Sequence, residues 1–161
     1  MAKDRKKSTD SAAPRLLNKK ARFNYEILET VEAGIALKGT EVKSLRAGDA
    51  SVNEAYARIT DGQVFLINFQ IQPYKQAGEV FNHDPKRPKQ LLLHKREIKK
   101  LSAKVQIRGQ TMVPLCVYFV KGKAKVEIAL ARGKKRGDKR QDERAKQDRK
   151  DIARAQRRGG M

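Results

Sequence analysis

The last 31 residues of the chain, 131–161, cannot form a hydrophobic core of their own. They contain one large aliphatic side chain, Ile152, besides the terminal Met161. They contain 13 Lys and Arg against 5 Asp and Glu, a net charge of +8. Ordering a backbone costs about 1–2 kcal/mol per residue, and a segment with so little apolar surface cannot offset that cost by burial. We therefore predict that residues 132–161 form a basic C-terminal tail, disordered when free and ordered on a strongly anionic partner.

Positive charge is concentrated at the two ends of the chain. Of the net charge of +20, residues 1–22 contribute +6, and residues 23–131 contribute another +6 over a far longer stretch. A charged surface that served solubility alone would be more evenly balanced. The distribution therefore indicates a polyanionic partner, with nucleic acid the leading candidate. Residues 1–17 show no apolar periodicity and are predicted to be a disordered basic arm.

The middle of the chain has the patterns of short β-strands. Apolar and polar residues alternate over residues 25–37, and Glu29 interrupts the apolar face, which predicts a bend or bulge. Asp61-Gly62 separates two β-rich runs, and such a dipeptide is a strong hairpin signal. A second hairpin is predicted around Lys121-Gly122.

Two helical segments interrupt these strands, one capped by Thr40 and one over residues 94–104. We predict that residues 18–131 form a mainly β domain, a closed barrel of about six strands with two or three short helices. A barrel is favoured over a sandwich because a domain of this size must hide its strand edges, and closure does so. The oligonucleotide-binding (OB) barrel is one such architecture.

The sequence contains no motif with the residue types and spacing of an enzyme active site. Cys116 is the single cysteine, which excludes an internal disulfide framework and is typical of a reducing compartment. Neither His83 nor His94 has a partner at metal-ligand spacing, and His83 is expected to be a loop or surface residue. No apolar run is long enough for a membrane span, and no hydrophobic region follows the basic start. We expect a cytoplasmic monomer that is not an enzyme and uses no metal or cofactor.

Several stretches of the chain occur together in the order found in one bacterial family. They are Asn18–Arg22, Glu32–Ile35, Gly39–Gly48, Leu91–Lys95, Val113–Leu115, Lys123–Ala129, Gly133–Lys135 and Asp138–Arg140. Over about residues 16–158 the chain resembles the small protein B (SmpB) family, whose members are partners of transfer-messenger RNA (tmRNA, also called SsrA RNA).

The resemblance implies an OB-type barrel that binds the tRNA-like domain of tmRNA and delivers this RNA to stalled ribosomes for trans-translation. It also implies that the tail enters the decoding centre of 16S rRNA and the empty mRNA channel, where it becomes helical. Elongation factor Tu and alanyl-tRNA synthetase would act on the same RNA. Two alternative functions stay open: a constitutive ribosomal protein with a basic extension, and an RNA-processing enzyme.

RNA shaped like a tRNA is recognised by its shape, its phosphates and stacking on its bases. Glu32 is the unexpected member of the implied tmRNA face, since a carboxylate repels phosphate; it could accept hydrogen bonds, or simply be a strand acid paired with a Lys. Leu92 has core packing as its alternative. By resemblance, the tmRNA-binding residues are Asn18, Lys19, Arg22, Phe23, Glu32, Leu92 and Lys125.

The tail has several ion pairs at helical spacing, such as Asp142 with Lys146. Each contributes roughly 0.2–0.5 kcal/mol, too little to hold a long helix in water. Gly137 stands where the family usually has an aromatic residue or His, so either the Arg136 guanidinium stacks instead or the contact is missing. The candidate ribosome contacts are Arg132, Lys134, Lys135, Arg136, Asp138, Lys139, Arg140, Arg144 and Arg149.

Overall fold

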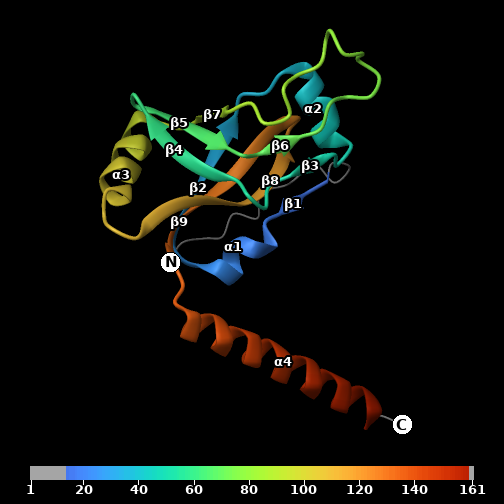
Figure 1. Ribbon diagram of the computed structural model, residues 1–161, viewed down its shortest axis with the longest axis vertical. Coiled ribbons are helices and arrows are strands. Elements are labelled where there is room, and N and C mark those ends of the chain that lie inside the picture. The colour runs from blue at the N-terminus through green and yellow to red at the C-terminus, as the bar shows by residue number, and fades with distance from the viewer. Residues whose placement is uncertain (1–13, 160–161) are drawn as a thin grey trace.

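A computed structural model describes residues 14–159 of the chain, and Figure 1 shows its arrangement as a strand-rich body with one long helix leading away from it. The strands of the body are β1 (Leu16–Leu17), β2 (Tyr25–Ile35), β3 (Ala50–Ser51), β4 (Tyr56–Thr60), β5 (Gln63–Ile67), β6 (Gln70–Ile71), β7 (Lys89–Leu92), β8 (Gln110–Val120) and β9 (Lys123–Gly133). The helices are α1 (Lys19–Asn24), α2 (Gly39–Arg46), α3 (Lys95–Val105) and α4 (Arg136–Arg158).

Six antiparallel strands form a closed ring of pairings, in the order β8, β4, β5, β7, β2, β9 and back to β8. The short strand β1 pairs with β8 outside this ring, and β3 pairs with β6. The mainly β, closed arrangement of about six strands confirms the expected fold class. Because the ring is closed, each of its six strands pairs with a neighbouring strand on both sides.

The interior of the ring is filled by alternate side chains of its strands, including Leu66, Leu91, Met112, Val126 and Ile128, all of them buried. A second, smaller cluster lies on the outer face of β8 and β9, where Ala21 of α1 covers Val113, Leu115, Ala129 and Ala131. Strand β8 is therefore buried on both faces. This explains why it is apolar at nearly every position.

The two turn dipeptides form the predicted hairpins. Asp61 and Gly62 have φ of 50° and 72°, and Lys121 and Gly122 have φ of 49° and 75°. Both residues of each turn are thus in the left-handed region that a two-residue hairpin requires. The register of β2 against β9 shifts between Ile27 and Glu29, which confirms the bulge predicted near Glu29.

The cap predicted for α2 was wrong. Lys38 is the N-cap, and its backbone N–H donates to the Glu41 carboxylate at 2.6 Å. Thr40 lies inside the helix, where its hydroxyl contacts His83 instead. A carboxylate three residues after the N-cap thus satisfies the backbone N–H of the N-cap residue itself.

Both predicted boundaries of the folded domain shift outward. Leu16 and Leu17 belong to β1 although they were assigned to the arm 1–17, and β9 continues to Gly133 although the tail was predicted to begin at 132. Pairing with β8 and β2 orders these residues, and local periodicity does not reveal such pairing. The rest of the predicted arm, residues 1–13, and residues 160–161 lie outside the described part of the chain.

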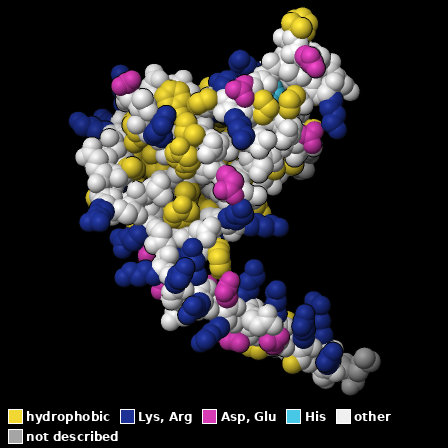
Figure 2. Space-filling model, in the orientation of Figure 1, with side chains coloured by type: hydrophobic (Ala, Val, Ile, Leu, Met, Phe, Trp, Pro, Cys, Tyr) yellow, Lys and Arg dark blue, Asp and Glu magenta, His cyan; other side chains and the backbone are white. Residues whose placement is uncertain are grey.

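The tail forms helix α4, in which no residue is buried. Figure 2 shows Lys and Arg side chains along its length. The sequence predicted a tail that is disordered when free and helical on a partner. The structure shows the tail as a helix. The disorder of the free tail stays a prediction. None of the helices among residues 14–159 is both long and apolar enough to cross a membrane.

Candidate nucleic-acid interface

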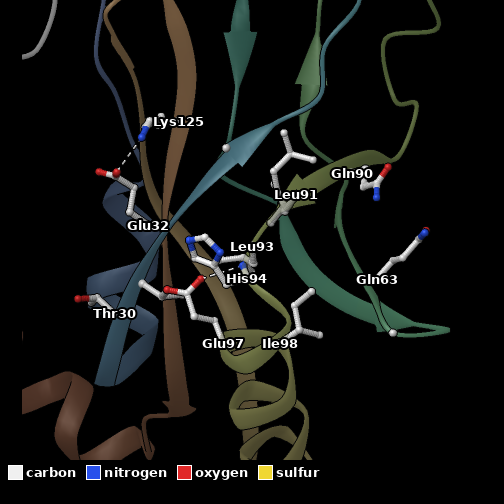
Figure 3. Close-up of a pocket in the computed structure, with 14 residues that line it drawn as sticks. Thr30, Glu32, Gln63, Gln90, Leu91, Leu93, His94, Glu97, Ile98 and Lys125 are labelled. Atoms are coloured by element: carbon white, nitrogen blue, oxygen red, sulfur yellow. Dashed lines mark hydrogen bonds and ion pairs between the residues drawn. The ribbon is translucent and has the colours of Figure 1, made fainter.

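An open hollow of about 730 Å³ lies on the outside of the ring, where β2, β7, β9 and α3 meet (Figure 3). Its position follows from the register, because Gly34 of β2 stands opposite Leu92 of β7 on one side and Lys125 of β9 on the other. Glu32 is two residues before Gly34 and therefore points to the same side of the strand. The hollow thus brings together Glu32, Leu92 and Lys125, three of the residues predicted to bind RNA.

Glu32 is held by two neighbours at the edge of this hollow. Lys125 Nζ donates to Glu32 Oε1 at 3.2 Å, and the Tyr118 hydroxyl donates to Glu32 Oε2. Burial, and then the hydrogen bond to Glu32, raise the pKa of Tyr118 well above its ordinary value, so the phenol stays protonated and able to donate. Glu32 is therefore paired with a Lys, which was one of the alternatives for this residue. It is also bonded to the Tyr118 hydroxyl, which the sequence analysis did not predict.

Tyr118 lies directly opposite Lys125 in the pairing of β8 with β9. Its ring is covered by the Arg15 guanidinium, 5.6 Å from the ring centre. Arg15 also donates to Cys116 Sγ at 3.4 Å. A polar row therefore continues from the hollow across β9 to β8, and a Tyr in an apolar strand was the signal that could have indicated it.

Leu92 is 56% exposed, so the alternative of core packing is wrong. Its side chain lies over Gly34, where a Cβ would meet Leu92 Cβ at 3.4 Å. The absence of a side chain at Gly34 leaves room for the leucine to lie across the strand. An exposed leucine between polar neighbours can contact a base or sugar face.

The other candidates lie on α1, and they divide into two kinds. Lys19, Arg22 and Phe23 are exposed, as an RNA-contacting role requires. Asn18 is 5% exposed, and its side chain is fully bonded within the protein. It accepts from the Ala21 backbone N–H at 3.1 Å and donates to the carbonyls of Pro114 and Val52 at 2.9 and 3.3 Å.

The expectation that Asn18 faces the RNA therefore needs correction, because its polar groups are already used in capping α1 and joining it to the ring. The α1 residues and the hollow lie toward opposite ends of β2, since Tyr25 and Glu32 are about 23 Å apart at 3.3 Å per residue. One RNA that contacted both groups would span most of this strand.

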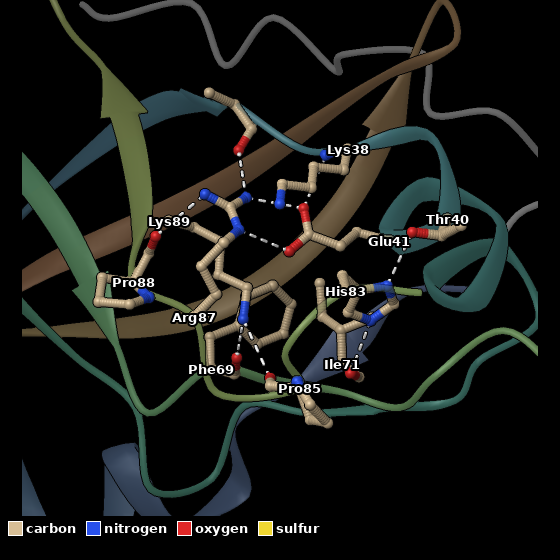
Figure 4. Close-up of polar contacts among 11 residues, drawn as sticks. Lys38, Thr40, Glu41, Phe69, Ile71, His83, Pro85, Arg87, Pro88 and Lys89 are labelled. Atoms are coloured by element: carbon tan, nitrogen blue, oxygen red, sulfur yellow. Dashed lines mark hydrogen bonds and ion pairs between the residues drawn. The ribbon is translucent and has the colours of Figure 1, made fainter. Parts of the chain in front are cut away.

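A buried polar network anchors the long connection between β6 and β7, as Figure 4 shows. Arg87 binds the fully buried Glu41 through two hydrogen bonds, Nε to Oε1 at 3.0 Å and Nη2 to Oε2 at 2.8 Å. Burial alone would raise the pKa of Glu41, but the hydrogen bonds from Arg87 and from the Lys38 N–H hold it below its ordinary value. The Arg87 guanidinium therefore joins this connection to helix α2.

Lys89 is also fully buried, and it donates to the carbonyls of Phe69 at 2.5 Å and Pro85 at 3.2 Å. Burial lowers its pKa to about 8, an effect that Glu41 partly opposes. His83 was expected in a loop or at the surface; it lies in the β6–β7 connection but is only 6% exposed. Its Nε2 lies 3.0 Å from the Ile71 carbonyl, which can only accept, so Nε2 carries the proton and Nδ1 accepts from Thr40 Oγ1 at 2.9 Å.

The tail residues also divide into two kinds. Lys134 is half-buried, donates to the Arg22 carbonyl at 3.0 Å and forms an ion pair with Asp142 of α4, so it joins the tail to α1. Arg132 is an exposed residue of β9, and Lys135 is the N-cap of α4. The remaining candidates lie on α4, with Lys139 half-buried and the others exposed: Arg136, Asp138, Lys139, Arg140, Arg144 and Arg149.

Within residues 14–159 no group of three or more His, Cys, Asp or Glu side chains is placed to hold a metal ion. The side chains that converge in the hollow can bind a polar partner through hydrogen bonds, charge and apolar contacts. These are the interactions expected of an RNA-binding surface.

Comparison with known proteins agrees with this geometry. A family model described as "SmpB protein" matches residues 15–158. A protein called "SsrA-binding protein" from Trichormus variabilis is 53% identical over 138 residues, covering 86% of this chain and 89% of its own length. Another of the same name, from Desulforudis audaxviator, is 54% identical and covers 87% and 91%. A chain from a solved structure described as "tmRNA-SmpB: a journey to the center of the bacterial ribosome" has a TM-score of 0.65 and 55% identity, covering 77% of this chain and 87% of that chain.

Proposed function

The chain belongs to the SmpB family, and on this premise we propose that it binds tmRNA and acts with it in trans-translation on the bacterial ribosome. The family is one of RNA-binding proteins and not of enzymes. The match extends from β1 to the end of α4, so it includes both the ring and the tail. A protein that works on ribosomes with an RNA partner works in the cytoplasm, and we propose that it does so as a monomer.

The observation that supports RNA binding most directly is the convergence of Glu32, Leu92 and Lys125 in one hollow. Lys125 is 93 residues from Glu32 in the sequence and bonded to it in the fold. We assign the tRNA-like domain of tmRNA to this hollow and to the exposed α1 residues Lys19, Arg22 and Phe23.

Lys125→Ala tests this assignment in filter binding with purified tmRNA. The variant should bind several-fold more weakly, because it loses a phosphate or base contact and removes the Lys125 bond that helps to hold Glu32. Lys86→Ala is the matched control, since Lys86 is exposed on the β6–β7 connection. Equal losses in the two variants would contradict a local site.

The affinity should also fall with salt. With about 6–10 phosphate contacts, it should drop roughly 10³- to 10⁵-fold between 50 and 200 mM. A flat response would contradict a mainly electrostatic interface.

We propose that the tail acts on the ribosome, in the decoding centre and the empty mRNA channel, after the ring has delivered the RNA. Elongation factor Tu and alanyl-tRNA synthetase would meet this protein through the shared RNA. Truncation after Lys135 keeps β9 and the N-terminal anchor of the tail but removes α4. The truncated chain should bind tmRNA nearly as well as the full chain and should fail to support peptide tagging on stalled ribosomes.

A constitutive ribosomal protein is the alternative, and the RNA that co-purifies with the native chain separates the two. Enrichment of one tmRNA would support the proposal. One copy of the protein on every ribosome would contradict it and support the constitutive ribosomal protein.

A further inference from the structure

The connection between β6 and β7 rises from one end of the ring (Figure 1), and hydrophobic side-chain atoms are exposed at its far end (Figure 2). Val80 is 88% exposed and Phe81 is 79% exposed. Among the described residues these are the most exposed of the large hydrophobic side chains. We call residues 79–82 the tip of this loop. Adjacent large hydrophobic residues so exposed indicate a surface that a partner covers.

The tip is held in place by Asn82. Its Oδ1 accepts from the Tyr74 N–H at 2.8 Å, and its Nδ2 donates to the carbonyls of Tyr74 at 2.9 Å and Gly78 at 3.1 Å. These bonds close the chain between Tyr74 and Asn82 into a compact turn. Lys43 of α2 lies 5.3 Å from the centre of the Tyr74 ring and supports it from the body.

The base of the loop is joined to the interior by the network described above. His83 bonds to Ile71 and Thr40, Arg87 bonds to Glu41, and the Ile71 N–H donates to the Pro85 carbonyl at 3.0 Å. Buried polar groups persist only where they are bonded in this way. The loop is therefore a fixed extension of the ring, and the position of its tip relative to the RNA-binding hollow is set.

The segment that contains the tip differs in charge from the chain as a whole. Residues 74–84 contain one Lys, Lys75, and two acids, Glu79 and Asp84, a local net charge of −1 in a chain of +20. Phosphate would be repelled by the two carboxylates that flank Phe81 on either side. A protein surface that offers an apolar pocket bordered by Lys or Arg fits both the hydrophobic pair and the flanking acids.

We propose that Val80 and Phe81 insert into an apolar pocket, rimmed by basic side chains, on a protein component of the ribosome. This rests on the proposed function only in placing the partner on the ribosome. The tip contributes a second, apolar attachment that is independent of the phosphate contacts of the tail and of the tmRNA hollow.

The experiment measures co-sedimentation of the protein–tmRNA complex with purified 70S ribosomes. The double variant Val80→Ser, Phe81→Ser should sediment at least tenfold more weakly than the wild type, with unchanged tmRNA affinity in filter binding. Ile107→Ser is the matched control, because Ile107 is 53% exposed on a different loop. It should behave as the wild type.

Two further variants separate an apolar pocket from stacking on a base. Phe81→Leu keeps the hydrophobic volume and should retain most of the ribosome binding, whereas a stacking role would be lost with the ring. A benzophenone amino acid placed at position 81 and irradiated on ribosomes should crosslink to protein. A crosslink to RNA would overturn the proposal.

Other outcomes are equally decisive. Equal sedimentation of the wild type and the double variant would overturn tip docking and leave the proposed function standing. Loss of tmRNA affinity in the double variant would overturn it as well, because the tip would then serve the RNA site. Failure of the wild type to bind tmRNA would overturn the proposed function, and with it this inference.

Discussion

The Tyr118 hydroxyl donates a hydrogen bond to the Glu32 carboxylate, joining β8 to β2 across the strand that lies between them. That strand, β9, carries Lys125, which binds the other oxygen of the same carboxylate. The carboxylate is thus held at both oxygens at the edge of the hollow. This arrangement is rigid, so a partner that bonds to Glu32 meets a preorganised acceptor.

Tyr118→Phe should weaken tmRNA binding by about tenfold and should also lower the free energy of unfolding. A hydrogen bond to a charged group contributes about 1.5–3 kcal/mol, and here its loss leaves Glu32 less well oriented. The control is Tyr74→Phe, which removes an exposed hydroxyl bonded to Gln76 at 2.7 Å. Unchanged affinity in Tyr118→Phe would show that Glu32 needs no such support.

Lys89→Met should change how stability depends on pH. Burial lowers the pKa of Lys89 to about 8 in the folded state, against its ordinary 10.5. Between these values the unfolded chain binds the Lys89 proton and the folded chain does not, so the wild type gains stability as pH rises.

Relative to Lys89→Met, the wild type should therefore gain on the order of 3 kcal/mol across this window. Urea unfolding at several pH values between 7.5 and 10.5 measures it. Lys86→Met, at an exposed lysine nearby, should show no such trend.

Asn18→Ala and Arg22→Ala should separate structure from RNA contact on one helix. Asn18→Ala removes the N-cap of α1 and the side-chain hydrogen bonds to the Pro114 and Val52 carbonyls, so it should lower the free energy of unfolding by about 1–3 kcal/mol. Arg22→Ala should leave stability unchanged and weaken tmRNA binding, because Arg22 is exposed. If Asn18→Ala instead weakened tmRNA binding and left stability unchanged, Asn18 would be an RNA contact.

Gly137→His should be accepted by the fold, since no atom lies within 4 Å of the position that a Cβ would occupy. It places an aromatic ring able to stack on a base directly before Asp138. Peptide tagging in a reconstituted translation reaction should rise, while tmRNA affinity should not change. Gly137→Ala controls for the gain in helix propensity alone, and equal activity of the two variants would exclude stacking.

The helix of the tail should fray in solution and form on a polyanion. Helix α4 has no buried residue, so its local pairs and the ion pair of Asp142 with Lys134 are its main support. The far-ultraviolet circular dichroism of the full chain minus that of the chain truncated after Lys135 isolates the tail. We expect weak helical signal in buffer that grows when heparin is added. A strong, salt-independent helix in buffer would contradict this account.

Local chemistry was enough to predict the features that depend on a few neighbouring residues. Asp61-Gly62 and Lys121-Gly122 adopt the left-handed conformations of tight turns, and the bulge lies at Glu29 as its break in the alternation indicated. The composition of residues 132–161 likewise predicted a segment without a core. Family resemblance identified Glu32, Leu92 and Lys125 as candidates, although it did not indicate how they are held.

Long-range pairing decided the rest. His83, Lys89 and Asn18 are polar residues in segments that look exposed, yet each is buried because distant carbonyls and hydroxyls complete its hydrogen bonds. Leu92 looks like a core residue but is exposed because Gly34 opposes it across the strand pair. The sequence by itself thus determined turns, strand periodicity and the coreless tail, which arise from local conformational energies. Only the tertiary structure decided which polar groups are buried and which are free to meet RNA, because the closure of the ring sets which residues become neighbours.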